Sequence, residues 1–321
     1  MKKELWVYVS LAGGQADSMS EALLAKAQEL AGDGEFELCA VLAGRGTFEA
    51  AKALASSGIP KVYWGENEDV LPCEYARIAK ILLPLVKEHE PEIFLFPATD
   101  SASIIASTLG VHLQTGVNVH CISAKIRDGI FVGAVPAFGG QVMSEILCPK
   151  KKPQMATVRL SGGAIKPTAP GEVIRFSADC PALPGIRLIS AETEAASGVS
   201  LADAEVVVCC GAGMADAEGW QLANKLADRL GGAACCTRNA LDMQCGATEK
   251  NMVGISGTTV SPKVYIGFGV SGSAHHMCGM RDSGMVININ RDAANAFFES
   301  SDYSFVGDAK NVAKALLNAL A

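Results

Sequence analysis

The chain has 321 residues and a formal net charge of −7, so it is long enough to form two domains, each with its own core. Its only basic run is Lys150–Lys152, and nucleic-acid binding is not expected because duplexes are bound by clustered Lys and Arg. No apolar run reaches the roughly 18 residues of a membrane span, and the amino terminus lacks the pattern of a signal peptide. We therefore expect a cytoplasmic protein without a membrane span.

Eleven cysteines are distributed through the chain without a C-x-x-C pair. The adjacent pairs Cys209–Cys210 and Cys235–Cys236 lie in apolar runs that are typical of buried strands. Zinc and iron–sulfur sites commonly take their ligands from closely spaced cysteines. We interpret the cysteines instead as reduced core residues, predict no metal site, and note that free thiols suit a reducing compartment.

The first half of the sequence alternates strand patterns with helix patterns. A capping box at Ser18 and Glu21 predicts the start of the first helix, Thr47 is placed to cap the second, and Pro84 is expected to bend or interrupt the third. Such alternation predicts an α/β domain with a parallel sheet covered by helices on both faces. The expected strands are residues 4–10, 36–43, 61–64 and 93–98, and the expected helices are residues 21–32, 48–57, 75–89 and 102–110.

The pattern changes between residues 117 and 160, where four strand-like runs follow one another without a helix between them. This arrangement predicts a small antiparallel extension of the sheet. The expected turns are at residues 128–129, 139–140 and 149–153.

Residues 161–200 are rich in Gly, Pro, Ala and Ser, a composition typical of a linker. We place a hinge at residues 190–201. The sequence therefore predicts two domains, residues 1–190 and residues 191–321.

The second half restarts the alternation of strands and helices. A strand at 204–213 closes on glycines, a helix follows to its stop at Gly231, and a further strand begins at Ala233. An amphipathic helix at 308–320 ends the chain. The sequence thus predicts a second doubly wound domain with a parallel sheet.

Residues 263–292, in this second half, indicate the chemistry most directly. An apolar strand at 264–268 leads into a glycine turn at 269–272, then into a helix-length segment with two adjacent histidines, and then into a second buried strand at 285–290. Open parallel sheets bind ligands at the carboxyl ends of their strands. Glycines let the main chain approach a phosphate, and a helix amino terminus offers free N–H groups to it. A dinucleotide is therefore the predicted ligand.

The same stretch, continued to the carboxyl terminus, closely resembles the flavin-binding end of the electron-transfer flavoprotein alpha subunit. That family typically reads G-I-S-G-A-x-Q-H-x-x-G-M-x-x-S, then A-I-N-x-D, then A-D-Y-x-x-V-G-D. The matching segments here are 269–283, 288–292 and 301–308, in the same order and spacing. The resemblance implies that the second domain is a Rossmann-like domain that binds FAD.

Segments of the first half are similar to the amino-terminal domain of the same family, namely residues 113–121, 135–146 and 153–159. The A-F-G-G segment and the P-Q-M-A-T-V-R that follows it are most similar to alpha subunits from anaerobes, which belong to complexes that bifurcate electrons from NADH. The resemblance implies a heterodimer with the electron-transfer flavoprotein beta subunit, which the first domain contacts. It also implies electron exchange with an acyl-CoA dehydrogenase or reductase and, in the bifurcating case, NADH as donor and ferredoxin or flavodoxin as acceptor. The chain would then be an electron-carrier subunit of an oxidoreductase complex rather than a stand-alone enzyme.

The resemblance also implies roles for side chains around the flavin ring. Arg238 matches an arginine beside the ring, where a cation stabilises the reduced, anionic flavin. Ser256 matches a hydroxyl residue near N5. His276 matches a histidine near the C2 carbonyl, and His275 stands where the family has Gln; only one of two adjacent histidines can face the cofactor. The alternative for Arg238 is a surface residue at a strand end, and without the resemblance Ser256 would be interpreted as an ordinary turn residue.

Further contacts are implied along the rest of the dinucleotide. Ser271 and the backbone of 272–274 would cradle phosphate, Asn290 would approach the pyrophosphate and ribityl region, and Asp302 would contact the adenosine end. The complete expected set is Arg238, Gly254, Ile255, Ser256, Gly257, Gly269, Val270, Ser271, Gly272, Ser273, Ala274, His275, His276, Asn290, Asp302 and Tyr303.

The chain departs from the family pattern at two cofactor positions. The phosphate-side arginine of the family is Ala212 here, and the glutamine before the N5 hydroxyl residue is Ile255. Because losing a charge-assisted contact commonly costs about 1.5–3 kcal/mol, we expect weaker FAD binding or a shifted potential. In the first domain, the loop at 97–107 has neither Arg nor Lys, so its partner contacts are expected to be specialised.

Two alternatives belong to other classes of protein. A stand-alone NAD-dependent Rossmann dehydrogenase would need a G-x-G-x-x-G turn, and residues 211–213 are not followed by the third glycine. A docking subunit that holds little or no flavin is the other alternative, and the residues at 212 and 255 are compatible with it.

Overall fold

The computed structural model describes residues 2–32, 34–71, 73–137, 142–160, 162–182, 185, 189–190 and 199–320. The described residues form two compact units: residues up to 190 make the amino-terminal unit, and residues 199–320 make the carboxyl-terminal unit. Most of the hinge expected at 190–201, and the turn expected at 139–140, lie outside the described residues. Those two expectations stay predictions.

The amino-terminal unit is built on a seven-stranded sheet in which every neighbouring pair of strands is parallel. The order of strands across the sheet is β12-β5-β4-β1-β6-β11-β7. Their bounds are β1 (Lys3–Tyr8), β4 (Phe36–Gly44), β5 (Lys61–Glu66), β6 (Ile93–Pro97), β7 (Val117–Cys121), β11 (Gln154–Val158) and β12 (Glu172–Arg175).

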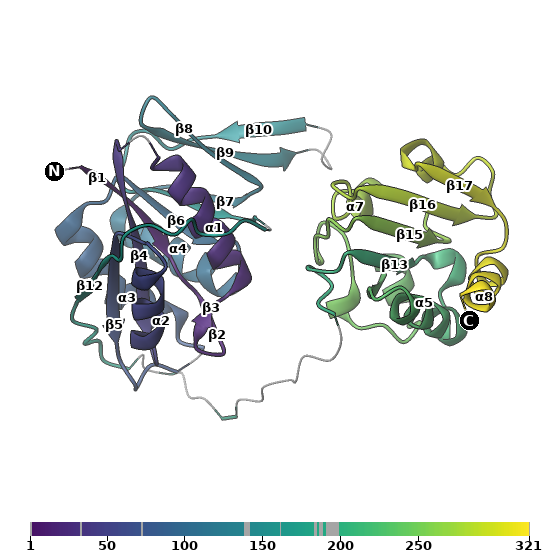
Figure 1. Ribbon diagram of the computed structural model, residues 1–321, viewed down its shortest axis with the longest axis horizontal. Helices are drawn as coiled ribbons and strands as arrows, with labels where there is room; N and C mark the ends of the chain where they lie inside the picture. Colours follow the sequence, from purple (N-terminus) through teal and green to yellow (C-terminus); the bar gives the residue numbers. More distant parts are fainter. Residues whose placement is uncertain are drawn as a thin grey trace. The chain divides into compact units, whose positions relative to one another are not determined.

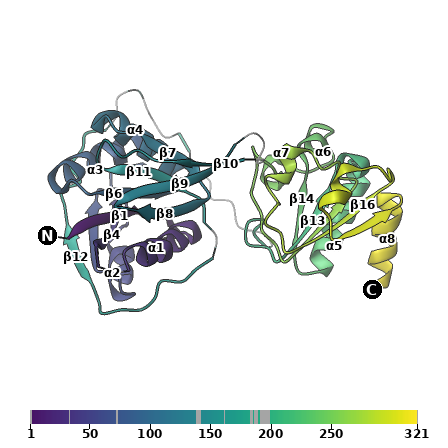
Figure 2. The same cartoon turned by 90° about the horizontal axis from the view of Figure 1, so that it is seen from above.

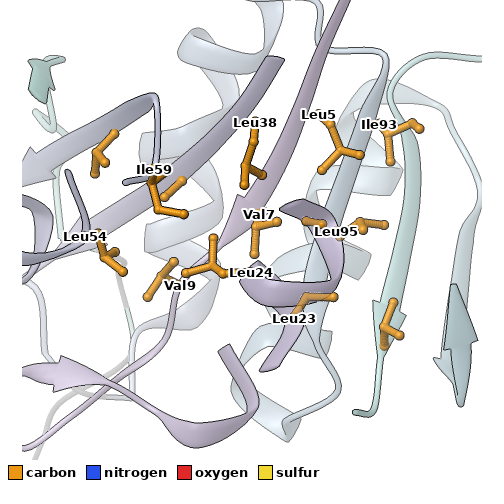
Figure 3. Close-up of a cluster of buried hydrophobic side chains, with 14 of the residues drawn as sticks. Leu5, Val7, Val9, Leu23, Leu24, Leu38, Leu54, Ile59, Ile93 and Leu95 are labelled. Atoms are coloured by element: carbon orange, nitrogen blue, oxygen red, sulfur yellow. The ribbon is translucent and has the colours of Figure 1, made fainter. Parts of the chain in front are cut away.

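Helices cover both faces of this sheet, as the alternating pattern predicts. The helices are α1 (Ser18–Leu30), α2 (Phe48–Ser56), α3 (Tyr75–His89) and α4 (Asp100–Leu113). Figure 2 shows α1 and α2 on one side of the sheet and α3 and α4 on the other. Because successive strand residues point to opposite faces, Leu5 and Val7 pack with α1 and α2, whereas Trp6 and Tyr8 pack with α3 and α4. Figure 3 shows the side chains of the first of these two cores turned toward one another.

The starts of the helices differ in part from the expected caps. Helix α1 begins after Asp17, whose carboxylate accepts the Ser20 N–H at 2.6 Å, so the capping box at Ser18 is wrong. Thr47 does precede α2, but its side chain makes no capping hydrogen bond. Pro84 lies inside α3, which continues through it from Tyr75 to His89.

Residues 117–160 do not form one antiparallel extension. Strands β8 (Ser123–Arg127), β9 (Ile130–Ala137) and β10 (Val142–Ile146) form a separate antiparallel sheet. Strands β7 and β11 instead join the parallel sheet, because β11 is buried along its whole length and fits between β6 and β7. The expected linker also contributes a strand, since β12 pairs with β5 at the sheet edge. A short hairpin of β2 (Leu11–Ala12) and β3 (Gln15–Ala16) follows β1.

The carboxyl-terminal unit contains a five-stranded parallel sheet with the order β14-β13-β15-β16-β17. The strands are β13 (Val206–Cys210), β14 (Ala233–Cys236), β15 (Val264–Phe268), β16 (Met285–Asn290) and β17 (Tyr303–Val306). The chain leaves β13 for one neighbour, β14, and later returns to the other side at β15. The strand order therefore reverses between β13 and β15, which makes this point the topological switch of the sheet.

One face of this second sheet packs against α5 (Ala217–Arg229) and α8 (Ala309–Ala319), which lie beside each other in Figure 1. The other face packs against residues of irregular segments, among them Val253, Val260 and Met280. The short helices are α6 (Arg238–Asp242), α7 (Ala274–Met277), η1 (Ala212–Met214), η2 (Glu249–Asn251) and η3 (Ala296–Ser300). The α/β class with two parallel sheets is thus confirmed, although the helix expected around the two histidines is only four residues long.

All eleven cysteines are free, and the two adjacent pairs are buried in β13 and β14 as expected. Among the helices that the structure describes, none has both the length and the apolar character needed to cross a bilayer.

Candidate functional site

A cavity of about 190 Å³ lies at the carboxyl edge of the second sheet. Its walls come from the segment after β13, the segment after β14, residues 252–256 and the turn after β15. It therefore sits at the switch between β13 and β15, where open α/β sheets bind ligands. The lining residues are Ala212, Thr237, Arg238, Asn239, Met252, Val253, Gly254, Ile255, Ser256, Ser271, Ser273, His275 and His276.

Three glycines bring two backbone segments together at this switch. The Gly211 N–H donates to the Phe268 carbonyl at 2.8 Å, and the Gly213 N–H donates to the Gly269 carbonyl at 3.0 Å. Gly269 has φ +66°, and a Cβ there would lie 2.7 Å from the Gly213 Cα. Only glycine combines this left-handed conformation with this close approach. Gly269, which was expected to belong to a phosphate-binding turn, therefore also holds the ends of β13 and β15 together with Gly211 and Gly213.

The turn after β15 presents hydroxyl groups to the cavity. Ser271 and Ser273 are exposed and line it, whereas Val270 is buried beneath the turn. Gly272 has φ +76°, and a Cβ there would lie 2.7 Å from Phe297. Ser271 and Ser273, both in the expected set, thus lie on the cavity wall, while the glycine between them is required by the packing of η3.

Arg238 stands at the start of α6, directly after β14. Thr237 caps this helix by accepting the Ala240 N–H at 3.3 Å. The Arg238 Nε donates to the two oxygens of Asp242 at 2.9 and 3.2 Å, and 61% of the arginine side chain is exposed. An exposed pair of this spacing contributes only about 0.3–0.5 kcal/mol. The guanidinium can therefore exchange Asp242 for another anion at little cost.

Residues 252–256 form another part of the cavity wall. The Ile255 N–H donates to the His275 carbonyl at 2.8 Å, and the Gly257 N–H donates to the Gly254 carbonyl at 3.1 Å. Gly254 has φ +148° and packs so closely on Gly279 that a Cβ on Gly279 would lie 2.5 Å from the Gly254 nitrogen. The Ile255 side chain is 61% exposed at the cavity, where the family pattern has a polar amide.

The two adjacent histidines have different surroundings. His275 is exposed at the cavity. His276 is only 4% exposed, with its Nδ1 2.9 Å from the Val253 carbonyl and its Nε2 2.6 Å from the Tyr265 hydroxyl. Both ring nitrogens of His276 thus have protein partners, which the sequence does not reveal because neither Tyr265 nor Val253 carries a local sign of this contact. His275 is the histidine whose side chain is open to solvent at the cavity.

A buried thiol completes the surroundings of His276. The Cys209 Sγ lies 3.9 Å from the His276 Nε2. Burial alone would raise the pKa of Cys209, but hydrogen bonding from Cys235 and the charge of His276 lower that pKa to about 5. Burial likewise opposes charge on His276, but the Cys209 thiolate and the Val253 carbonyl raise the pKa of His276 above its ordinary value. The two groups therefore stabilise each other's charged forms.

The remaining expected residues lie away from the cavity wall. Asn290 ends β16 at the carboxyl edge, and its side-chain amide donates to the Val270 carbonyl at 3.0 Å. Asp302 and Tyr303 lie at the start of β17, where an Asp302 oxygen accepts the Val286 N–H at 2.7 Å. The start of a parallel strand is the opposite edge of the sheet from the cavity, so the expected contact of Asp302 with the adenosine end of a ligand is corrected.

Asp308 is an acidic residue at the carboxyl edge, next to the end of β16, because the Gly307 N–H before it donates to the Asn290 carbonyl at 3.0 Å. It follows β17 and caps α8 by accepting the Asn311 N–H at 3.0 Å. The sequence carries a signal for it, because an acid between a short strand and an amphipathic helix marks a helix amino terminus. Thr237 and Asn239 were also missed, although both flank Arg238 directly after a strand.

Comparisons with known proteins cover both units. Residues 5–180 match the electron transfer flavoprotein domain, and residues 200–281 match the electron transfer flavoprotein FAD-binding domain. The electron transfer flavoprotein subunit alpha of Thermoanaerobacterium thermosaccharolyticum is 33% identical over 320 residues, which cover 98% of this chain and 97% of that protein.

Two further relatives carry other names. The acryloyl-CoA reductase electron transfer subunit beta of Anaerotignum propionicum is 27% identical over 99% of this chain and 95% of its own length. The lactate dehydrogenase (NAD(+),ferredoxin) subunit LctC of Acetobacterium woodii is 27% identical over 97% of this chain and 75% of its own length.

Proposed function

Because this chain belongs to the electron transfer flavoprotein alpha-subunit family, we propose that it carries electrons by means of an FAD held at the carboxyl edge of the second sheet. Its carboxyl-terminal unit contains the FAD-binding domain of that family. The observation that carries the proposed location is the cavity at the switch between β13 and β15, with Arg238 and three serines on its wall. When bound, FAD supplies one- and two-electron chemistry that amino-acid side chains lack.

The residues of the cavity suit the polar parts of such a ligand. The close approach of Gly211, Gly213 and Gly269 leaves no side chain between the backbone and a phosphate at the switch. The hydroxyls of Ser271 and Ser273 are placed to donate to phosphate oxygens. Because Ala212 supplies no charge where the family pattern has arginine, phosphate binding depends on these uncharged donors.

The residues near the proposed flavin ring supply charge and hydrogen bonds. Arg238 would place a positive charge beside the ring and favour its reduced, anionic form. The Ser256 hydroxyl would donate or accept a hydrogen bond at the edge of the ring. His275, rather than the buried His276, would offer the exposed imidazole. At the other end of the ligand, Asp308 would replace Asp302 because it lies at the correct edge of the sheet.

The proposed partners follow from the family and its named relatives. We infer a heterodimer with a beta-type subunit that the amino-terminal unit contacts. The relatives in acryloyl-CoA reductase and in an NAD- and ferredoxin-dependent lactate dehydrogenase support an electron-exchange role with a dehydrogenase or reductase. An acyl-CoA dehydrogenase or reductase is the proposed redox partner, and NADH-dependent bifurcation with ferredoxin or flavodoxin is the proposed mode.

The test begins with flavin content after co-expression with the beta-type subunit. Two FAD per heterodimer, together with NADH oxidation that requires both acceptors, would support bifurcation. One FAD together with AMP would support a simple electron shuttle and contradict bifurcation. No flavin, even after FAD is added, would contradict the redox proposal and leave a docking subunit.

Two variants that each replace one arginine by glutamine, and so lose the same charge, test the location of FAD. Arg238→Gln is expected to weaken FAD binding by about tenfold to a hundredfold, because it removes a charged hydrogen-bond donor from the cavity. Arg229→Gln is the matched control, since Arg229 lies in the same unit at the end of α5 and does not line the cavity. Equal FAD affinity for the two variants would contradict this location.

A further inference from the structure

A buried thiol lies beside one of the histidines that line the cavity. Cys209, in β13, is 0% exposed, and its Sγ lies 3.9 Å from the Nε2 of His276, which is part of the cavity wall. The Tyr265 hydroxyl, from β15, lies 2.6 Å from the same Nε2 and is also hydrogen-bonded to the Cys209 sulfur. The sulfur of Cys209 is therefore connected to the cavity through side chains and not through solvent.

The side chains packed around the Cys209 sulfur are hydrogen-bond donors. The Cys235 thiol, from β14, and the Tyr265 hydroxyl both bond to it, and burial raises the pKa of each so that each keeps its proton. The Nδ1 of His276 lies 2.9 Å from the Val253 carbonyl, which can only accept, so this nitrogen is protonated. A second proton on Nε2 faces the Tyr265 hydroxyl and the Cys209 sulfur. Donors from three elements favour the thiolate form of Cys209.

The charges of Cys209 and His276 depend on each other. Burial alone would raise the pKa of Cys209, but its donors and the charge of His276 lower that pKa to about 5. Burial alone would lower the pKa of His276, whereas the Cys209 charge and hydrogen bond raise it above its ordinary value. Without Cys209, only the Val253 carbonyl opposes the effect of burial on the histidine. The charged ring of His276 therefore requires the thiolate.

The two charges act unequally on a ligand in the cavity. His276 lines the cavity, whereas Cys209 does not, so the positive charge lies closer to the ligand than the negative one. Coulomb energy falls with distance and is larger where water is excluded. The pair therefore attracts an anion in the cavity. A flavin gains negative charge on reduction to its anionic form, so the attraction favours the reduced cofactor over the oxidised one.

We propose that Cys209 is a positioning residue that keeps the His276 ring charged at the cavity wall, so that a flavin bound there is easier to reduce. The inference rests on the proposed location of FAD. Cys209 acts through His276 and needs no contact with the cofactor.

The test replaces Cys209 by serine in the full chain. Serine keeps a small side chain with a hydroxyl, but it does not ionise near neutral pH. Cys210→Ser is the matched control, because Cys210 is the next residue of β13, is also 0% exposed and packs on the opposite face of the sheet. Burial raises the pKa of Cys210, so this control removes a thiol without removing a charge. Cys209→Ala serves the same purpose if the serine variant does not fold.

The first readout is the titration of His276 without FAD. Selective ¹⁵N labelling of the five histidines reports their protonation, and the His276 signal is assigned by its absence from His276→Asn. Wild type and Cys210→Ser are expected to titrate above the ordinary histidine pKa of 6.5. In Cys209→Ser the pKa of His276 is expected to fall below that value, because burial then dominates.

The second readout is the midpoint potential of bound FAD at pH 7, measured in the complex with the beta-type subunit. The affinity for reduced FAD relative to oxidised FAD is expected to fall by about tenfold in Cys209→Ser, which appears as a more negative potential. Cys210→Ser is expected to keep the potential of wild type. A packing defect alone would change FAD affinity in both oxidation states and leave their ratio unchanged.

The outcomes separate this inference from the proposed location of FAD. If Cys209→Ser shifts the His276 titration but not the potential, and Arg238→Gln leaves FAD affinity unchanged, the proposed location fails and the pairing of Cys209 with His276 stands. If the potential is unchanged although Arg238→Gln weakens FAD binding, the inference is overturned. It is also overturned if Cys209→Ser titrates like wild type, or if Cys210→Ser lowers the potential as much as Cys209→Ser does.

Discussion

Replacing Gly269 by alanine tests whether the close packing of the segments that follow β13 and β15 organises the site. Two separate costs follow from the structure. The backbone at φ +66° disfavours a side chain by about 1–2 kcal/mol. The new Cβ would also lie 2.7 Å from the Gly213 Cα, and relieving such an overlap in a packed region costs about 1–3 kcal/mol. Gly269→Ala is therefore expected to lower the free energy of unfolding of the carboxyl-terminal unit by about 2–5 kcal/mol.

Two other glycines of the same unit separate these costs. Gly231 follows α5 at φ +65° with no atom within 4 Å of the position of a Cβ, so Gly231→Ala carries the backbone cost alone. Gly211 has φ −88°, but its Cβ would overlap the Gly269 carbonyl, so Gly211→Ala carries the overlap cost alone. The gain that alanine brings by restricting the unfolded chain is common to all three variants.

The assay is urea unfolding of the full chain, followed by hydrogen-exchange mass spectrometry of peptides from β13 and β15. FAD titration of the same variants provides the second measurement. We expect Gly269→Ala and Gly211→Ala to lose FAD affinity, and Gly231→Ala to retain it because it lies away from the cavity. The reasoning is refuted if Gly269→Ala destabilises the unit no more than Gly231→Ala, or if Gly211→Ala binds FAD like wild type.

Three further predictions concern charged groups. Asp216 caps α5 through the Gly219 N–H, so Asp216→Ala should cost about 1 kcal/mol in urea unfolding, and Asp216→Asn, which keeps the cap, clearly less. Arg77→Met removes the buried cation 3.0 Å from Glu74 and should destabilise the amino-terminal unit by about 3–5 kcal/mol; a loss below 1 kcal/mol would contradict this. Because the pKa of Cys209 is lowered to about 5, its contribution to stability is lost as the pH falls through that value. Stability of the carboxyl-terminal unit should therefore rise between about pH 5 and the ordinary histidine pKa of 6.5, and Cys209→Ala should abolish that slope in urea unfolding.

The Asp216 prediction also has a pH dependence. Lys310 and the Gly219 N–H hold the pKa of Asp216 below its ordinary value of 3.8. A lowered carboxyl pKa stabilises the folded chain above the ordinary value and loses that effect as the pH falls through the lowered one. The difference between wild type and Asp216→Asn should thus disappear in strong acid, which unfolding measured at pH 2–4 would check.

Local pattern was sufficient for the parts of the fold that depend on near neighbours in the chain. The apolar runs at 264–268 and 285–290 became β15 and β16, and the glycine turn between them became the cavity wall that presents Ser271. These features are local because strand and turn preferences are set by the side chains themselves and by the φ values they allow.

Other features depended on which segments meet in space. The sequence of residues 117–121 and 154–158 does not show which strands they pair with. In the fold, β11 is buried between β6 and β7, and this packing places both segments in the parallel sheet. Asp302 and Asp308 both flank a short strand, and the direction of β17 in the sheet decided which of them reaches the carboxyl edge.

The sequence by itself determined that there are two α/β units. It also determined that glycines follow two central strands of the second unit, and that Arg238, Ser256 and two histidines lie in the segments that connect strands of that unit. Tertiary structure alone decided which histidine is buried. His275 and His276 are chemically identical and adjacent on α7, and they differ only because Tyr265 and Val253 lie beneath one of them. A hydrogen bond between residues distant in the chain has no local signature, since each partner is compatible with an ordinary core position until the fold brings the two together.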